Sequence, residues 1–223
     1  MAETKIASHF FKYNNLKYFR DGAENIEMCS FGEKKDPLGP KSYLSVEGKV
    51  ARKHLEGRIK KIPSVDIDWS KQSKADVEAN GLIPVYGIPV KVGTTYSYEE
   101  AKSADLKLIK FVIDEGPLKK MLNNDANAAR NYLADEGKDG RIVSSIWVVM
   151  EGKLARHFDS VGSISANAAG SNLEITASGG VAGSQTITLS EGTTFAYAMH
   201  KVKKWNKGKT EIEDMEDDYH GIG

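Results

Sequence analysis

Two neighbouring stretches, residues 82–98 and 106–113, carry the clearest alternation of apolar and polar positions. In the first stretch, Pro84 and Pro89 confine a strand to a sheet edge or interrupt it. The second stretch is largely apolar on both faces, as in a strand covered from two sides. We predict that residues 82–114 form a long antiparallel hairpin with residues 99–104 at or near its tip.

A helical period follows directly. Apolar side chains recur every three or four positions after Pro117; they are Leu118, Met121, Leu122, Ala129, Tyr132 and Leu133. Proline suits the first turn of a helix and Gly137 ends one, so the pattern predicts a helix over residues 117–134 that packs this stripe on a sheet. Residues 6–19 fit a short amphipathic helix more loosely.

Most of the remaining chain has the composition of strands. The predicted extended or strand segments are 43–67, 142–151, 153–158, 163–178, 185–189 and 193–205, with Glu191-Gly192 as the turn between the last pair. This order predicts an α+β fold, with a twisted, mixed and mainly antiparallel sheet, long β-hairpins and a few packing helices. We expect residues 1–205 to form a single domain.

The composition excludes several classes of protein for this chain. The chain has 223 residues, of which 40% are hydrophobic, so it can bury a core, and its net charge of zero argues against nucleic-acid binding. A single cysteine, Cys29, excludes an intramolecular disulfide framework. The first residues are too polar for a signal peptide, and the longest apolar run, 146–150, is too short for a transmembrane helix. We therefore expect a soluble, cytoplasmic protein.

The neutral total hides an asymmetry of charge. Residues 206–223, the C-terminal segment, contain six acidic residues and two lysines, a net charge of −4, which leaves +4 on residues 1–205. Two interpretations stay open: an exposed, mobile appendage without a role, or an acidic segment that lies on the basic body and masks it.

A second charged feature is a basic cluster that follows residue 49; its members are Arg52, Lys53, Arg58, Lys60 and Lys61. A solvated face is one explanation, and attraction to anionic lipid headgroups or phosphates is the other. Only Trp69 supplies an aromatic ring nearby, which weakens the case for single-stranded nucleic acid.

Catalytic motifs are absent from the sequence. It has no phosphate-binding loop and no Gly-x-Ser-x-Gly elbow, and the spacing of His54, His157 and His200 does not suggest a metal site. We expect Cys29 to be a buried thiol rather than a nucleophile, because the sequence does not indicate a histidine that would act as its base. We expect neither an enzyme nor a metal or cofactor.

Residues 95–205 resemble the pore-forming domain of gasdermins, and the small bacterial and fungal members most. Three stretches carry the resemblance: Tyr96-Ser97-Tyr98-Glu99-Glu100-Ala101-Lys102-Ser103-Ala104-Asp105-Leu106 with the strand and helix after it, Asp139-Gly140-Arg141-Ile142-Val143-Ser144-Ser145-Ile146-Trp147-Val148-Val149-Met150-Glu151, and 186–202 with its Glu191-Gly192 turn. The resemblance implies a cell-death effector of the kind used in antiphage defence. Such a protein is an autoinhibited monomer that is cut by an activating protease, forms a homo-oligomer and inserts two β-hairpins per subunit into a membrane.

The resemblance, taken together with the asymmetry of charge and the lysine-rich composition around residue 206, suggests roles for particular residues. The C-terminal segment has the size of the family's inhibitory peptide, with Ile212, Met215 and Tyr219 expected to dock on apolar surface. The candidate cleavage region contains Lys203, Lys204, Lys207 and Lys209. The candidates for membrane-inserting hairpins are Val85, Ile88, Val90, Val92, Leu106, Leu108, Ile109, Phe111 and Ile113. On activation, the protein is expected to move from the cytoplasm to the membrane. Its partners there would be anionic membrane lipids, which the basic cluster would contact.

Two other classes remain. A non-enzymatic assembly subunit of a phage particle or injection apparatus would share the long hairpins, the Gly/Ser-rich turns and the zero net charge. A binding module that uses the basic face is the third possibility.

Overall fold

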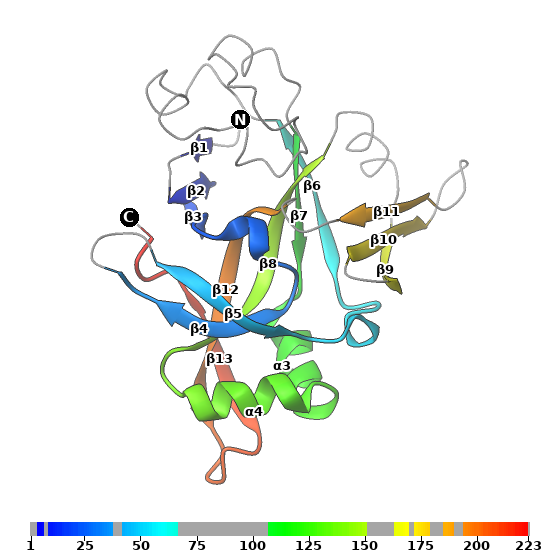
Figure 1. The fold of residues 1–223 in the computed structure, drawn as a ribbon. Helices are drawn as coiled ribbons and strands as arrows, with labels where there is room; N and C mark the ends of the chain where they lie inside the picture. The colour runs from blue at the N-terminus through cyan, green and yellow to red at the C-terminus, as the bar shows by residue number, and fades with distance from the viewer. Residues whose placement is uncertain are drawn as a thin grey trace.

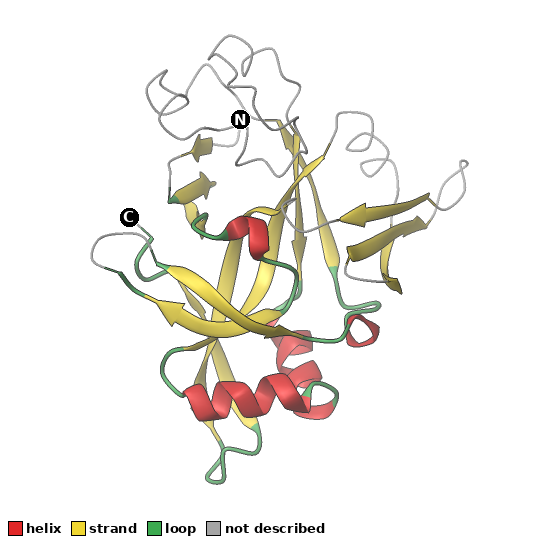
Figure 2. Cartoon of the chain, viewed as in Figure 1, coloured by secondary structure: helices red, strands yellow, loops and turns green. Residues whose placement is uncertain are grey.

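The structure is a computed structural model, and it describes residues 4–6, 9–37, 42–66, 107–150, 163–169, 172–178, 185–189 and 194–222. The strands are β1 (Thr4–Ile6), β2 (Phe10–Tyr13), β3 (Leu16–Phe19), β4 (Ser30–Lys35), β5 (Tyr43–Lys49), β6 (Lys60–Asp66), β7 (Lys107–Val112), β8 (Gly140–Met150), β9 (Ser163–Ala169), β10 (Asn172–Ser178), β11 (Gln185–Leu189), β12 (Thr194–Trp205) and β13 (Ile212–Asp218). The helices are α3 (Glu115–Asn124) and α4 (Asn127–Glu136), with short 3₁₀ turns at Ala23–Asn25 and Arg52–His54. Within the described ranges, these elements confirm an α+β fold whose strands pair antiparallel (Figure 2).

Two long strands, β8 and β12, organise the large sheet (Figure 1). They pair with each other from Thr194↔Val148 to His200↔Ile142. The outer edge of β8 is shared by β4 at its start and β7 towards its end, and β6 continues the sheet beyond β7. The outer edge of β12 is likewise shared, by β3 at Tyr197 and by β13 from Met199 onwards. The C-terminal half of β12 is therefore covered by the last strand of the chain.

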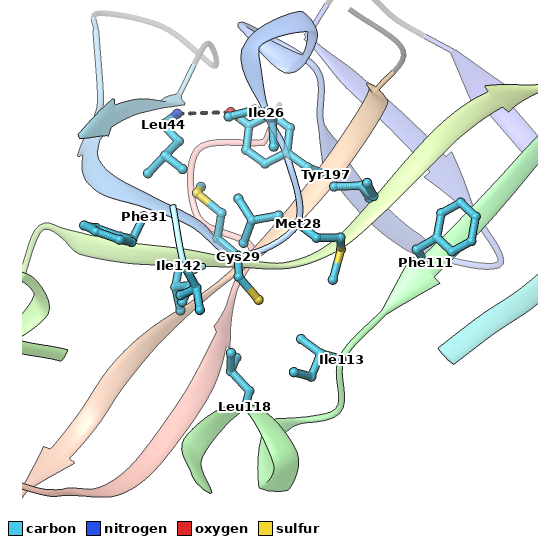
Figure 3. Close-up of a cluster of buried hydrophobic side chains, with 14 of the residues drawn as sticks. Ile26, Met28, Cys29, Phe31, Leu44, Phe111, Ile113, Leu118, Ile142 and Tyr197 are labelled. Atoms are coloured by element: carbon cyan, nitrogen blue, oxygen red, sulfur yellow. Dashed lines mark hydrogen bonds between the residues drawn. The ribbon is translucent and has the colours of Figure 1, made fainter. Parts of the chain in front are cut away.

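Both faces of this central pair are buried where the two strands pair with each other, over residues 140–148 and 194–200. On one face, the helices cover a core that includes Met28, Cys29 and Leu118 (Figure 3). On the other, aromatic rings pack edge to face: Phe11 lies 5.2 Å from Trp147 and 5.4 Å from Phe195 between ring centroids. Burial on both faces explains the nearly continuous apolar character of residues 142–148.

Tyr197 ties the sheet to two other segments. Its hydroxyl accepts a hydrogen bond from the backbone N–H of Leu44 at 3.0 Å (Figure 3). The same hydroxyl donates a hydrogen bond to the carbonyl of Asp21, also at 3.0 Å. Because the side chain is fully buried, both bonds replace water that this hydroxyl has lost.

The expected helix over residues 6–19 is wrong. This region forms the hairpin of β2 and β3, in which Phe11 faces Tyr18 across the pair. The turn is Asn14-Asn15, with φ values of 47° and 67°. Asparagine tolerates this left-handed conformation, and two such residues match the twist of a two-residue hairpin turn.

The helix predicted over 117–134 is present but divided. α3 ends at Asn124 and α4 starts at Asn127, with Asp125 and Ala126 between them. Leu118, Met121, Leu122 and Leu133 are buried as expected, and Gly137 follows α4 with φ 66°. The break lets α3 pack on β13 while α4 packs on β4 and β8.

Two predicted strand pairings are wrong. Residues 107–112 do not pair with 82–98, since β6 occupies one edge of β7 and β8 the other; residues 67–106 lie outside the described ranges. β11 does not form a hairpin with β12 but joins β9 and β10 in a separate three-stranded sheet. In both cases alternation identified a strand but could not select its partner.

Candidate functional site

The C-terminal segment is part of the sheet. β13 pairs with β12 from Met199↔Asp218 to Trp205↔Ile212, and Figure 1 shows it beside the lower half of β12, next to the helices. Of the two interpretations left open for this segment, the exposed, mobile appendage is therefore wrong from Ile212 onwards. The domain boundary expected after residue 205 falls at the turn of a β-hairpin.

Apolar side chains anchor this strand in the core. Ile212 and Met215 are each 2% exposed, and Ile222 is buried as well, whereas Tyr219 stays exposed. Strict alternation would place residues three apart on opposite faces of a strand. The register shifts around Lys204, where β12 and β13 each carry one extra residue, allow both Ile212 and Met215 to reach the core.

The start of β13 is also held from its other side, by α3. The Asn123 side chain donates from Nδ2 to the carbonyl of Ile212 at 3.0 Å and accepts from the Ile212 N–H at Oδ1 at 2.9 Å. One amide thus satisfies both main-chain groups of a single residue, as a neighbouring strand would. Lys119 adds a bond from Nζ to the carbonyl of Glu213.

Asp218 makes the strongest polar contact of the segment. Its Oδ2 accepts from Lys34 Nζ at 3.0 Å and from Arg141 Nε at 2.6 Å, while Oδ1 accepts from the His220 N–H. The three charged side chains are 2%, 3% and 8% exposed. Burial raises the pKa of Asp218, but the bonds from Arg141 and Lys34 outweigh burial and hold the pKa below its usual 3.8.

The outer surface of the β12–β13 pair carries matched opposite charges. Lys201 pairs with Glu216 at 3.0 Å, Lys203 with Asp214 at 3.2 Å and Lys204 with Glu213 at 2.6 Å. Hydrogen bonds to these acids raise the pKa of Lys203 and Lys204. Such exposed pairs contribute little to stability, because water and salt screen them. The negative charge of the segment thus lies directly against basic residues of the body.

The candidate cleavage region divides between strand and turn. Lys203 and Lys204 belong to β12, whereas Lys207 and Lys209 are exposed in the connection to β13. Asn206 closes this connection: its Oδ1 accepts from the Thr210 N–H, and its own N–H donates to the carbonyl of Glu211. Lys207 and Lys209 are consequently the members that a protease could reach without opening the sheet.

The basic cluster is largely ion-paired. Arg52 is buried 3.7 Å from Glu27, Arg58 bonds to Asp125 at 2.7 Å, and Lys60 bonds to Asp114. Lys53 is exposed and Lys61 is half-buried. The positive charge that this cluster offers to solvent is therefore smaller than its composition indicates, and its attraction to lipid stays a prediction.

The membrane-inserting candidates fall into two groups. Leu108, Ile109, Phe111 and Ile113 lie on or directly after β7 and are at most 1% exposed in the folded protein. Val85, Ile88, Val90, Val92 and Leu106 lie outside the described residues. No helix in the described ranges has the length and apolarity needed to cross a membrane.

The other chemistry-bearing side chains form no metal cluster within the described residues. Cys29 is fully buried, and burial raises the pKa of its thiol to about 12, as expected for a thiol that packs rather than reacts. His200 lines a cavity of 310 Å³ whose wall includes Asp217 and Tyr219 of the C-terminal segment. Burial lowers the pKa of His200, against the opposing effect of Asp217 and Glu115.

The sequence analysis did not single out several residues of this site: Lys34, Lys119, Asn123, Arg141 and Asp218. Arg141 offered one signal, because it directly precedes the buried run 142–148, and a cation at the end of a buried strand requires an anionic partner. The identity of that partner, 77 positions away, had no local signature.

No protein-family model matches this chain, and neither curated proteins nor solved structures supply a match.

Proposed function

We propose that this chain is a pore-forming protein that is held inactive by its own C-terminal segment and activated when a protease cuts the turn at 207–209. The support that carries the proposal is the docking of β13: a separable, acidic strand occupies the outer edge of β12 and neutralises its lysines. We propose pore formation as the activity because residues 95–205 resemble the pore-forming domain of gasdermins.

The proposal requires that release changes the surface of the body. Loss of residues 206–223 changes the net charge from zero to +4 and exposes the edge of β12 between Met199 and Trp205. An unpaired strand edge is a template for another strand, and added positive charge favours an anionic bilayer. The released body would then pair with further copies at the membrane.

The decisive experiment places a site-specific protease sequence between Gly208 and Lys209 and measures dye release from phosphatidylserine and phosphatidylcholine vesicles. We expect dye release from the anionic vesicles after cutting, because the bilayer then competes with the cut segment for the basic body, and none from the intact chain. The chain without the inserted sequence, treated with the same protease, is the matched control. In parallel, expression of residues 1–205 should arrest growth while the full chain does not. No dye release by the cut chain and no growth arrest by residues 1–205 would together contradict pore formation.

The lipid contact has its own test. Because Arg52, Arg58 and Lys60 are paired with acids, reversing their charge would also disturb folding, so exposed Lys53 is the informative position. Lys53→Glu should weaken sedimentation of the cut chain with phosphatidylserine vesicles, and added salt should do the same. Equal binding to phosphatidylcholine vesicles would remove the electrostatic explanation. Rings or tubes that form in lipid-free buffer would instead favour the assembly-subunit class.

A further inference from the structure

The C-terminal segment is held in the way that sheet-edge binding sites hold extended peptides. Its main chain adds a strand to the edge of β12, and Ile212, Met215 and Ile222 fill apolar positions at intervals along it. Addition to a sheet edge supplies affinity through main-chain bonds, and pockets for particular side chains supply specificity. We name the surface of β12, α3, Lys34 and Arg141 that contacts residues 212–222 the C-terminal groove.

The groove contains a receptor for one carboxylate, built by strands other than β12. Lys34 comes from β4 and Arg141 from β8, and both bond to the same oxygen of Asp218. Arg141 is oriented by the body itself, since its Nη1 also donates to the carbonyls of Lys138 and Gly140. Two buried cations in fixed positions select a carboxylate by both charge and geometry.

The groove also recognises the main chain at its opposite end. Asn123 presents one donor and one acceptor to the backbone of Ile212. Near the other end, Lys34 Nζ donates to the carbonyl of His220 at 2.8 Å and Lys17 Nζ donates to that of Ile222 at 3.3 Å. These contacts fix the register and direction of whatever strand lies there, because they address particular carbonyl groups.

We propose that the C-terminal groove is a reversible binding site for an extended acidic peptide, with residues 211–222 as its resident ligand. The recognised pattern is an apolar residue (Ile212), a second apolar residue three positions later (Met215) and a buried aspartate three positions after that (Asp218). A peptide with this pattern binds in trans once the turn at 206–210 is cut. The site stands on contacts within the folded chain and does not depend on pore formation.

The test uses the full chain cut at a protease sequence inserted between Gly208 and Lys209, in lipid-free buffer. The cut fragment should stay bound during size-exclusion chromatography, because the contacts of β13 do not involve the severed bond. A fluorescein-labelled synthetic peptide of residues 209–223 should then replace it, as followed by fluorescence anisotropy. Loss of the fragment on cutting would overturn the proposal, and so would a fragment that excess peptide cannot displace.

Unlabelled peptides then test the carboxylate receptor by competition, with the protein itself unchanged. A peptide with Asp218→Asn should need at least about ten times the concentration of the wild-type peptide for half displacement, because the buried Arg141 loses its anion and the buried Lys34 keeps only Asp36, at 3.7 Å. A peptide with Glu213→Gln should compete within about two-fold, since its pair with Lys204 is exposed. Equal competition by the Asp218→Asn peptide, or by a scrambled peptide of the same composition, would overturn the proposal. Either result would leave the vesicle-leakage test standing.

Discussion

Arg141 and Asp218 are joined by a buried hydrogen-bonded ion pair of 2.6 Å between Nε and Oδ2, although 77 residues separate them in the chain. Arg141 lies at the start of central strand β8 and Asp218 at the end of the last strand. The pair thus connects the C-terminal segment to the middle of the sheet, beyond the strand with which the segment pairs.

Asp218→Asn should lower the free energy of unfolding by about 3 kcal/mol, because it leaves the buried Arg141 without the anion it bonds to and leaves the buried Lys34 with only Asp36, at 3.7 Å. Urea denaturation measures this loss. Glu213→Gln is the matched control in the same strand and should cost much less, because its pair with Lys204 is exposed. A loss as small for Asp218→Asn as for the control would show that the buried pair adds nothing.

Asn123→Ala should free the start of β13, since it removes both hydrogen bonds to the Ile212 backbone. We expect a loss of about 1–2 kcal/mol and faster hydrogen exchange at the Ile212 amide. Asn124→Ala, at the next and exposed position of α3, should leave that amide protected. Unchanged exchange at Ile212 in the Asn123 variant would contradict the role assigned to this side chain.

Gly221→Ala should destabilise the end of the segment by about 1–3 kcal/mol. Gly221 has φ 76°, and an added Cβ would lie 1.8 Å from Ser42 Oγ. Gly208→Ala is the comparison, because its nearest neighbour would lie at an ordinary 3.7 Å and its φ is not in the left-handed region. Thermal unfolding should separate the two variants, and similar melting temperatures would argue against the close approach at Ser42.

The stability of the folded chain should decrease as the pH falls below about 6.5, in part through His200. Burial holds the pKa of His200 below its usual 6.5, so in this window the unfolded chain binds a proton that the folded chain does not. His200→Asn should make the decrease between about pH 7 and pH 5 smaller, as measured by urea denaturation. His220→Asn, which replaces an exposed histidine, controls for the loss of a histidine in general. A wild-type profile in the His200 variant would contradict this contribution.

Local patterns predicted local structure well. The helical stripe from Leu118 to Leu133 and the buried strand at 142–148 are both present, because burial on one side or on both sides leaves a period in the sequence. The break at Asp125-Ala126 has no such period. The hairpin at 10–19 did have a signal, the pair Asn14-Asn15, which the apolar spacing around it obscured.

Pairing over long distances was not predictable in the same way. The acids of β13 were visible in the sequence, but nothing local indicated that Lys34, 184 positions away, would meet Asp218. Likewise, β7 had an apolar pattern that suited any covered strand, and its partners are β6 and β8. Partner choice depends on how the whole sheet closes, which a single sequence records only weakly.

The buried Cys29 makes opening of the hydrophobic core measurable, because its thiol can be labelled only when the core opens. Its sulfur lies among Ile113, Leu118 and Ile142 (Figure 3), and with its pKa raised to about 12 the reactive thiolate is scarce at neutral pH. A thiol-labelling reagent therefore reacts only after local or global unfolding exposes Cys29, and each labelled molecule has unfolded in this way once. Because the chain has no second cysteine, the labelling rate reports on this core alone, in the intact and in the cut protein.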